Sequence, residues 1–130
     1  MKLLTIDDNT DITRLLAWYC TGMEIDCKEV NDGQKGLFEI QNRHYDLIFL
    51  DIEMPFYTGF DILRQLKKHG VRHKCIIILT GSNLKIADFA DYIDVGVREI
   101  LKKPIGLDEF DRIVKSYLTD DKWSIHQEHK

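Results

Sequence analysis

Short apolar runs alternate with stretches of helical spacing five times along this chain of 130 residues. Residues 47–50 (LIFL) and 75–79 (CIIIL) carry apolar side chains on both faces, which is typical of strands buried in a parallel sheet. Helices that cover both faces of a mainly parallel, five-stranded sheet would account for this alternation, so the pattern predicts an α/β fold. The expected strands are residues 3–6, 25–30, 47–50, 75–79 and 98–101, and the expected helices start at Thr10, after Asp32 and near Phe60, occupy residues 84–95, and run on from Leu107.

The length and composition of the chain indicate a single globular domain and argue against several other classes of protein. The length suits one domain, and 44% apolar with 31% charged residues is typical of globular proteins. A net charge of −4 without a long basic patch argues against direct nucleic-acid binding. The apolar runs are too short for a membrane helix, and the N-terminus is unlike a signal peptide. Three widely spaced cysteines, Cys20, Cys27 and Cys75, fit reduced thiols in the cytoplasm better than a disulfide framework or a zinc site.

Five polar residues follow the ends of four expected strands. Right-handed crossovers bring the carboxyl ends of parallel strands to one edge of the sheet, where open α/β sheets bind ligands. We therefore expect the five side chains to lie close together. They are Asp7 and Asp8 after the first strand, Asp51 after the third, Thr80 after the fourth and Lys103 after the fifth.

Three converging carboxylates would repel one another unless a cation joined them, and a hard divalent ion such as Mg²⁺ prefers oxygen ligands. A carboxylate beside Mg²⁺ can act as a nucleophile on phosphorus and form an aspartyl phosphate. The amine of Lys103 and the hydroxyl of Thr80 can each bind a phosphoryl oxygen. The five residues therefore favour phosphoryl transfer to a carboxylate.

These residues resemble the receiver domain of response regulators in two-component (phosphorelay) signalling. The resemblance covers residues 1–118, leaves residues 119–130 as a polar C-terminal tail, and implies a flavodoxin-like, doubly wound (βα)5 fold. A receiver is no enzyme for other substrates, because it catalyses only its own phosphorylation and dephosphorylation. The matching motifs are Asp7-Asp8, Asp51 with Met54-Pro55 and Gly59 behind it, Thr80, and Lys103-Pro104.

The resemblance also implies a role for each residue of the site. Asp51 would be the phosphoacceptor, and Thr80 and Lys103 would bind the phosphoryl group. The Lys103–Pro104 peptide bond would be cis. The implied ligands of the Mg²⁺ cofactor are Asp8, Asp51, the backbone carbonyl of Glu53 and, through water, Asp7.

A sensor histidine kinase or a phosphotransfer protein would supply the phosphoryl group in the cytoplasm. A downstream effector protein or domain would read it at the face of the fourth helix, fifth strand and last helix, and a phosphorylation-dependent homodimer is a further expectation. Neither nucleic acid nor membrane is an expected direct partner. Because no output domain follows residue 118, we expect either a stand-alone receiver or a piece of a larger protein.

Five residues bear on whether this chain behaves as the family does. Thr80 and Ile100 are the expected switch residues. Many receivers have an aromatic at the position of Ile100, so we expect a weaker or different rotamer change at this residue. Phe56 and Tyr57 would form an exposed docking patch, a hydrophobic lid on the site, or packing on the third helix. Glu53 flanks the path of a hydrolytic water and would tune the lifetime of the phosphoryl group.

Ordinary structural explanations exist for single residues of the site. Asp7 and Asp8 could merely precede a helix capped by Asn9 or Thr10, and Asp51 could begin an Asx turn. Five such coincidences at one edge favour the functional interpretation. Two other functions stay open: a phosphate-uncoupled receiver that binds a partner constitutively, and a phosphohydrolase with an Asp nucleophile. Two of the five histidines, His69 and His73, are expected at a helix end or a solvated turn.

Overall fold

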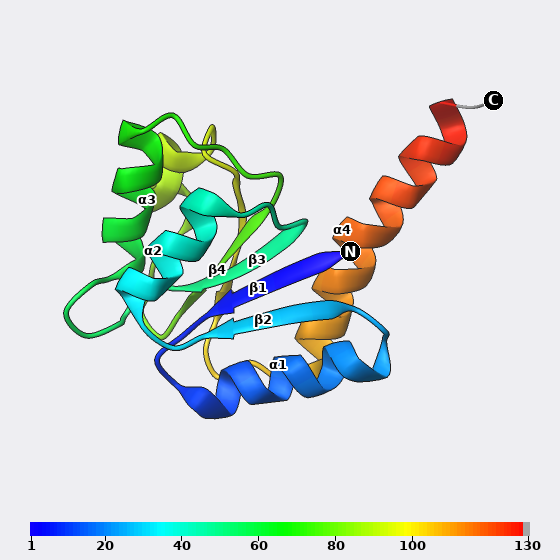
Figure 1. Ribbon diagram of the computed structural model, residues 1–130, viewed down its shortest axis with the longest axis horizontal. Helices are drawn as coiled ribbons and strands as arrows, with labels where there is room; N and C mark the ends of the chain where they lie inside the picture. The colour runs from blue at the N-terminus through cyan, green and yellow to red at the C-terminus, as the bar shows by residue number, and fades with distance from the viewer. Residues whose placement is uncertain (129–130) are drawn as a thin grey trace.

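The computed structural model describes the backbone of residues 1–128 and the side chains of residues 1–117. Five parallel strands form one sheet in the order β2-β1-β3-β4-β5, with helices on both faces (Figure 1). This strand order confirms the predicted flavodoxin-like fold. The strands are β1 (Lys2–Ile6), β2 (Asp26–Val30), β3 (Leu47–Asp51), β4 (Ile76–Thr80) and β5 (Val97–Lys102), and the helices are α1 (Thr10–Gly22), α2 (Gly33–Asn42), α3 (Gly59–Lys68), the 3₁₀ helix η1 (Ile86–Tyr92) and α4 (Leu107–Glu128).

The central strands of the sheet are buried on both faces. Neighbouring residues of a strand point to opposite sides, so each strand contributes to two cores. On one side, Ile48 belongs to a core that includes side chains of α2, α3 and η1. On the other side, Phe49 belongs to a core with α1 and α4, and its ring meets that of Phe110 edge to face at 5.3 Å between centroids. Figure 1 shows α2 and α3 on one side of the sheet and α1 and α4 on the other. This two-sided burial explains the uninterrupted apolar runs of the central strands.

Side-chain caps determine where three of the helices begin. Asn9 accepts a hydrogen bond from the backbone N–H of Asp11 at the start of α1. Asp32 caps α2 by accepting from the N–H of Lys35, as predicted. Thr58 and Asp61 form a reciprocal capping box at the start of α3. Since each cap lies shortly after a strand, the turns at this edge are tightly defined.

The segment after β4 differs from the prediction. Residues 84–95 were expected to form an amphipathic α-helix, but only a 3₁₀ helix is present at Ile86–Tyr92. The backbone of Phe89 departs from helical angles (φ −110°, ψ 16°), while its fully buried ring stacks on Phe60 at 5.0 Å. Ile86 and Ile93, which the prediction assigned to the helix, are 45% and 42% exposed. The buried ring of Phe89, with Leu84 and Tyr92 packed beside the same core, therefore anchors this segment in place of a continuous apolar face.

Helix α4 extends further than its apolar pattern indicates. Its backbone continues without a break from Leu107 to Glu128, through the predicted boundary at residue 118 and into the predicted polar tail. Figure 1 shows the C-terminal half of this helix projecting away from the sheet. A polar helical segment has no apolar stripe, so its sequence carries no periodic signal. The last two residues of the predicted tail, 129–130, lie outside the described part of the chain.

The prediction for the two histidines was half right. His69 caps the C-terminal end of α3. His73 is buried, however, and its Nε2 lies 2.6 Å from the carbonyl oxygen of Ile40, so it belongs to the packing between α2 and the start of β4. All three cysteines are reduced thiols, of which Cys20 and Cys75 are buried and Cys27 is half-buried. Within the described residues, every helix is too short or too polar to cross a lipid bilayer.

Candidate functional site

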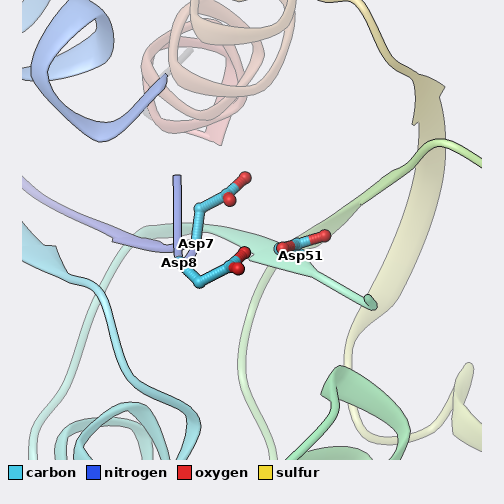
Figure 2. A group of neighbouring side chains, drawn as sticks. All are labelled: Asp7, Asp8 and Asp51. Atoms are coloured by element: carbon cyan, nitrogen blue, oxygen red, sulfur yellow. The ribbon is translucent and has the colours of Figure 1, made fainter. Parts of the chain in front are cut away.

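Three carboxylates meet at the carboxyl ends of β1 and β3. Asp7 and Asp8 follow β1, and Asp51 is the last residue of β3. One carboxylate oxygen from each lies within 4.8 Å of the others. Figure 2 shows the three side chains side by side, with Asp7 and Asp8 extending to the side on which Asp51 lies. Asp7 and Asp51 are fully buried, whereas Asp8 is exposed, so the site opens to solvent at Asp8.

Lys103 joins the two buried carboxylates. Its Nζ lies 3.0 Å from Asp7 Oδ2 and 3.2 Å from Asp51 Oδ1. The backbone supports this position: the N–H of Lys103 donates to the carbonyl oxygen of Thr80 at 2.7 Å, and the following peptide bond to Pro104 is cis, as the resemblance implied. The structure thus brings a cation from the end of β5 to the acids at the ends of β1 and β3.

The electrostatics of the site differ between acid and base. Burial, followed by the nearby charge of Asp7, raises the pKa of Asp51 from 3.8 to about 7, although Lys103 opposes the rise. Burial alone would lower the pKa of Lys103, but its hydrogen bonds and ion pairs with Asp7 and Asp51 outweigh burial and raise that pKa. Lys103 is therefore charged near neutral pH. The raised pKa of Asp51 means that burial and the charge of Asp7 disfavour its ionised form.

One oxygen of Asp51 is left without a partner. Oδ1 accepts from the backbone N–H of Glu53 at 3.1 Å and lies near Lys103, but the buried Oδ2 has no hydrogen-bond partner within the described part of the protein. A buried, unpaired carboxylate oxygen is costly unless a cation or a reacting group meets it. Two or three carboxylates around such an oxygen are donors that suit Mg²⁺. The residues present therefore fit a divalent cation.

The side chain of Glu53 takes part in the site, which the sequence did not indicate. Its Oε2 accepts from the Thr80 hydroxyl at 2.8 Å, and its Oε1 accepts from the N–H of Gly81 at 2.7 Å. Sequence reasoning assigned Glu53 only a backbone carbonyl and a place beside a water path. An acid two residues past the end of a central strand was the available signal, but its partner lies 27 residues away.

The remaining predicted residues lie in different surroundings. Ile100 is half-buried within β5, opposite Ile78 in the sheet register, and packs against the core on the α2 and α3 side. Tyr57 is half-buried and packs on the same core. Phe56 is fully exposed and has a left-handed backbone (φ 66°), which is unfavourable for a bulky side chain. A cavity of about 380 Å³ beside Asp8 is lined in part by Phe56 and Tyr57.

Comparison with known proteins points to one family. The family model of the response regulator receiver domain matches residues 3–115. The chain is 27% identical over 118 residues to the transcriptional regulatory protein CiaR of Streptococcus pneumoniae, which is 91% of this chain and 51% of CiaR. It is 29% identical over 129 residues to the transcriptional regulatory protein TctD of Salmonella typhimurium, which is 98% of this chain and 56% of TctD. The chain thus spans about half the length of these curated relatives.

Solved structures give the same result. The receiver domain of the Francisella response regulator 1452 matches with a TM-score of 0.77 and 27% identity, over 92% of this chain and 98% of that one. The response regulator TrrA of Thermotoga maritima, solved in complex with Mg²⁺ and beryllofluoride, matches with a TM-score of 0.69 and 25% identity, over 89% of this chain and 97% of that one. The chain therefore belongs to the response regulator receiver domain family of two-component signalling.

Proposed function

We propose that this receiver accepts a phosphoryl group on Asp51 from a sensor histidine kinase or a phosphotransfer protein and thereby switches the binding of an effector protein or domain. The observation that carries the proposal is the free, buried Oδ2 of Asp51. It belongs to a carboxylate that clusters with those of Asp7 and Asp8 and whose other oxygen, Oδ1, lies 3.2 Å from Lys103 Nζ. Reduced thiols and such partners suit a cytoplasmic protein. A phosphorylation-dependent homodimer is a further proposed assembly.

In the proposed reaction, Asp51 Oδ2 attacks the phosphorus of a phosphohistidine. The new O–P bond forms as the P–N bond breaks, and the imidazole leaves with the electron pair and takes up a proton from solvent. Lys103 Nζ, now near both buried carboxylates, can turn to a phosphoryl oxygen once Asp51 is esterified. The hydroxyl of Thr80 can donate to another oxygen. Loss of the phosphoryl group to water would reset the protein.

Mg²⁺ is the proposed cofactor, because the donor set consists of hard oxygen atoms. Asp8, Asp51 and the backbone carbonyl of Glu53 would hold the ion directly, and Asp7 would act through water. When bound, the ion would neutralise the carboxylates and bind a phosphoryl oxygen. The Mg²⁺–beryllofluoride complex of TrrA supports this assignment, because TrrA is a relative of the same fold and family.

The test is phosphorylation of wild-type protein and of Asp51→Asn by a small phosphodonor such as acetyl phosphate, with Mg²⁺ or with EDTA. Intact-mass spectrometry should show one added phosphoryl group on the wild-type protein only with Mg²⁺ and none on Asp51→Asn. Incorporation into the variant at the wild-type rate would overturn the assignment. Asp94→Asn, which removes an exposed acid remote from the site, is the matched control.

A second candidate function, constitutive partner binding uncoupled from phosphate, is favoured by one observation. Ile100 is an aliphatic residue packed in the core, with neither a ring to move inward nor a polar tip to expose. If this candidate is right, beryllofluoride and Mg²⁺ will leave partner affinity unchanged. If the switch operates, the same addition will change that affinity.

A further inference from the structure

The carboxylate of Glu53, in the loop after β3, contacts the end of β4 and the first residue of the loop after it. One oxygen accepts from the Thr80 hydroxyl at 2.8 Å and the other accepts from the Gly81 N–H at 2.7 Å. The oxygen of Thr80 in turn accepts from the N–H of Ser82 at 3.0 Å, so its orientation is determined from both sides. We call this set of contacts between Glu53 and the Thr80–Gly81 pair the Glu53 bridge.

The donors of the Glu53 bridge, a hydroxyl and a backbone N–H, are of the kind that bind an anion, and they follow directly on Leu79, which pairs with Asp51 in the sheet register. A hydroxyl and a backbone N–H each have one proton to donate, so each can serve one strong acceptor at a time. A carboxylate offers two oxygens to them, much as two oxygens of a phosphoryl group would. Thr80 is fully buried, which makes its hydroxyl costly to leave unpaired. The bridge therefore satisfies the site while no phosphoryl group is present.

From this geometry we infer that the Glu53 carboxylate is an internal anion that occupies the phosphoryl-binding donors Thr80 and Gly81 in the unphosphorylated protein and must leave before they bind phosphate. The inference rests on the proposed function of Asp51 and assigns to Glu53 a positioning role. Repulsion between the carboxylate and a phosphoryl dianion drives the exchange. Glu53 is exposed, so the released side chain reaches water without unfolding any element.

The consequence is competition. An intact bridge stabilises the resting arrangement of the loop after β4 and weakens phosphate-like ligands, since their binding first breaks two charge-assisted hydrogen bonds. Glu53→Ala frees both donors. Glu53→Gln keeps the side-chain volume and one acceptor oxygen but loses the charge, so its effect should be intermediate. Both variants retain the backbone carbonyl assigned to the metal.

The experiment measures the affinity of Mg²⁺–beryllofluoride for the full chain by ¹⁵N NMR titration. Relative to wild type, Glu53→Ala should bind about tenfold more tightly, a change of about 1.4 kcal/mol, and Glu53→Gln about threefold more tightly. In a Thr80→Ala background, the gain from Glu53→Ala should shrink to about threefold, because one of the two contested donors is already absent. Glu29→Ala, which removes an exposed charge on β2, should change the affinity less than twofold.

A readout without any ligand tests the bridge itself. The amide of Gly81 should shift upfield in Glu53→Ala, because it loses a short hydrogen bond to a charged acceptor. An unchanged Gly81 amide, or a gain below twofold in beryllofluoride affinity, would overturn the inference. Failure of the proposed function has a different signature: wild type and Asp51→Asn would then bind beryllofluoride equally, or neither would bind it.

Discussion

Replacing Asp51 by Asn should stabilise the folded protein, and the gain should depend on pH. Burial first, and then the charge of Asp7, raises the pKa of Asp51 from its ordinary 3.8 to about 7. The folded state therefore holds more protons than the unfolded chain between about pH 4 and pH 7. Because the excess protons are on the folded side, the free energy of unfolding falls as the pH rises through this window. The Asn side chain, which does not ionise, avoids that loss.

The expected size follows from the same shift. A rise in pKa from 3.8 to about 7 corresponds to about 4 kcal/mol lost from the free energy of unfolding once the pH exceeds 7. Asp51 is fully buried, so solvent screening reduces this value little. The coupling with Lys103, whose Nζ lies 3.2 Å away, is already part of the shift. We expect Asp51→Asn to gain about 2–4 kcal/mol at pH 8 and less than about 1 kcal/mol at pH 4.

Urea denaturation in EDTA at several values between pH 4 and pH 8 would measure the difference. Asp94→Asn, at an exposed position, should stay within about 0.5 kcal/mol of wild type at each pH. A gain from Asp51→Asn that is equal at pH 4 and pH 8 would refute the argument, as would a loss at pH 8. Added Mg²⁺ should reduce the gain, because a cation offsets the repulsion that the variant removes.

Three further predictions concern single positions. Phe56→Gly should raise the free energy of unfolding by about 1 kcal/mol in urea denaturation, because glycine adopts the left-handed backbone of this residue without strain and the Phe56 side chain is fully exposed. Phe56→Ala, which keeps a Cβ, should change it by less than about 0.5 kcal/mol. Gly96→Ala should cost more than about 2 kcal/mol, because a Cβ at φ 130° would lie 2.2 Å from the carbonyl oxygen of His73, while Gly106→Ala, with open space around it, should cost under about 1 kcal/mol. Mg²⁺ should raise the melting temperature of wild type in a thermal scan, and Asp8→Asn should remove most of that increase because it deletes one proposed ligand.

The fold and the position of the site could be predicted because both depend on local pattern. Strands buried on two faces give apolar runs such as residues 47–50, and parallel connections bring the strand ends to one edge. Polar residues directly after those runs, among them Asp7 and Asp51, must then converge, and their carboxylates do lie together. Helix starts were visible for the same reason, since a cap such as Asp32 lies beside the residues it caps.

The features that were missed depend on contacts distant in sequence. Residues 84–95 have helical spacing, yet they form only a 3₁₀ helix at Ile86–Tyr92, in which Phe89 has non-helical backbone angles and its ring stacks on Phe60. His73 has the sequence surroundings of a surface turn, but its side chain is buried and its Nε2 is within hydrogen-bond distance of the carbonyl oxygen of Ile40 in α2. The contact between Glu53 and Thr80 joins the loop after β3 to the last residue of β4. Periodicity carries no information on such pairs, because side-chain packing in three dimensions selects them.

The contacts of the loop after β4 indicate how a phosphoryl signal would spread without an aromatic at position 100. The Glu53 bridge joins this loop to the loop after β3, and the hydrogen bond from Lys102 Nζ to Asn83 Oδ1 joins it to the end of β5. Breaking the bridge removes both hydrogen bonds of the Glu53 carboxylate to the end of β4, so the start of this loop can move toward the phosphoryl group. The rings of Phe89 and Tyr92 in η1 contact Phe60 of α3 and would carry the movement onward. Amide shifts on addition of beryllofluoride should therefore extend through residues 81–92. Shifts that stop at Thr80 would mean that the loop does not transmit the signal, and that partner binding is set by surfaces phosphate does not reach.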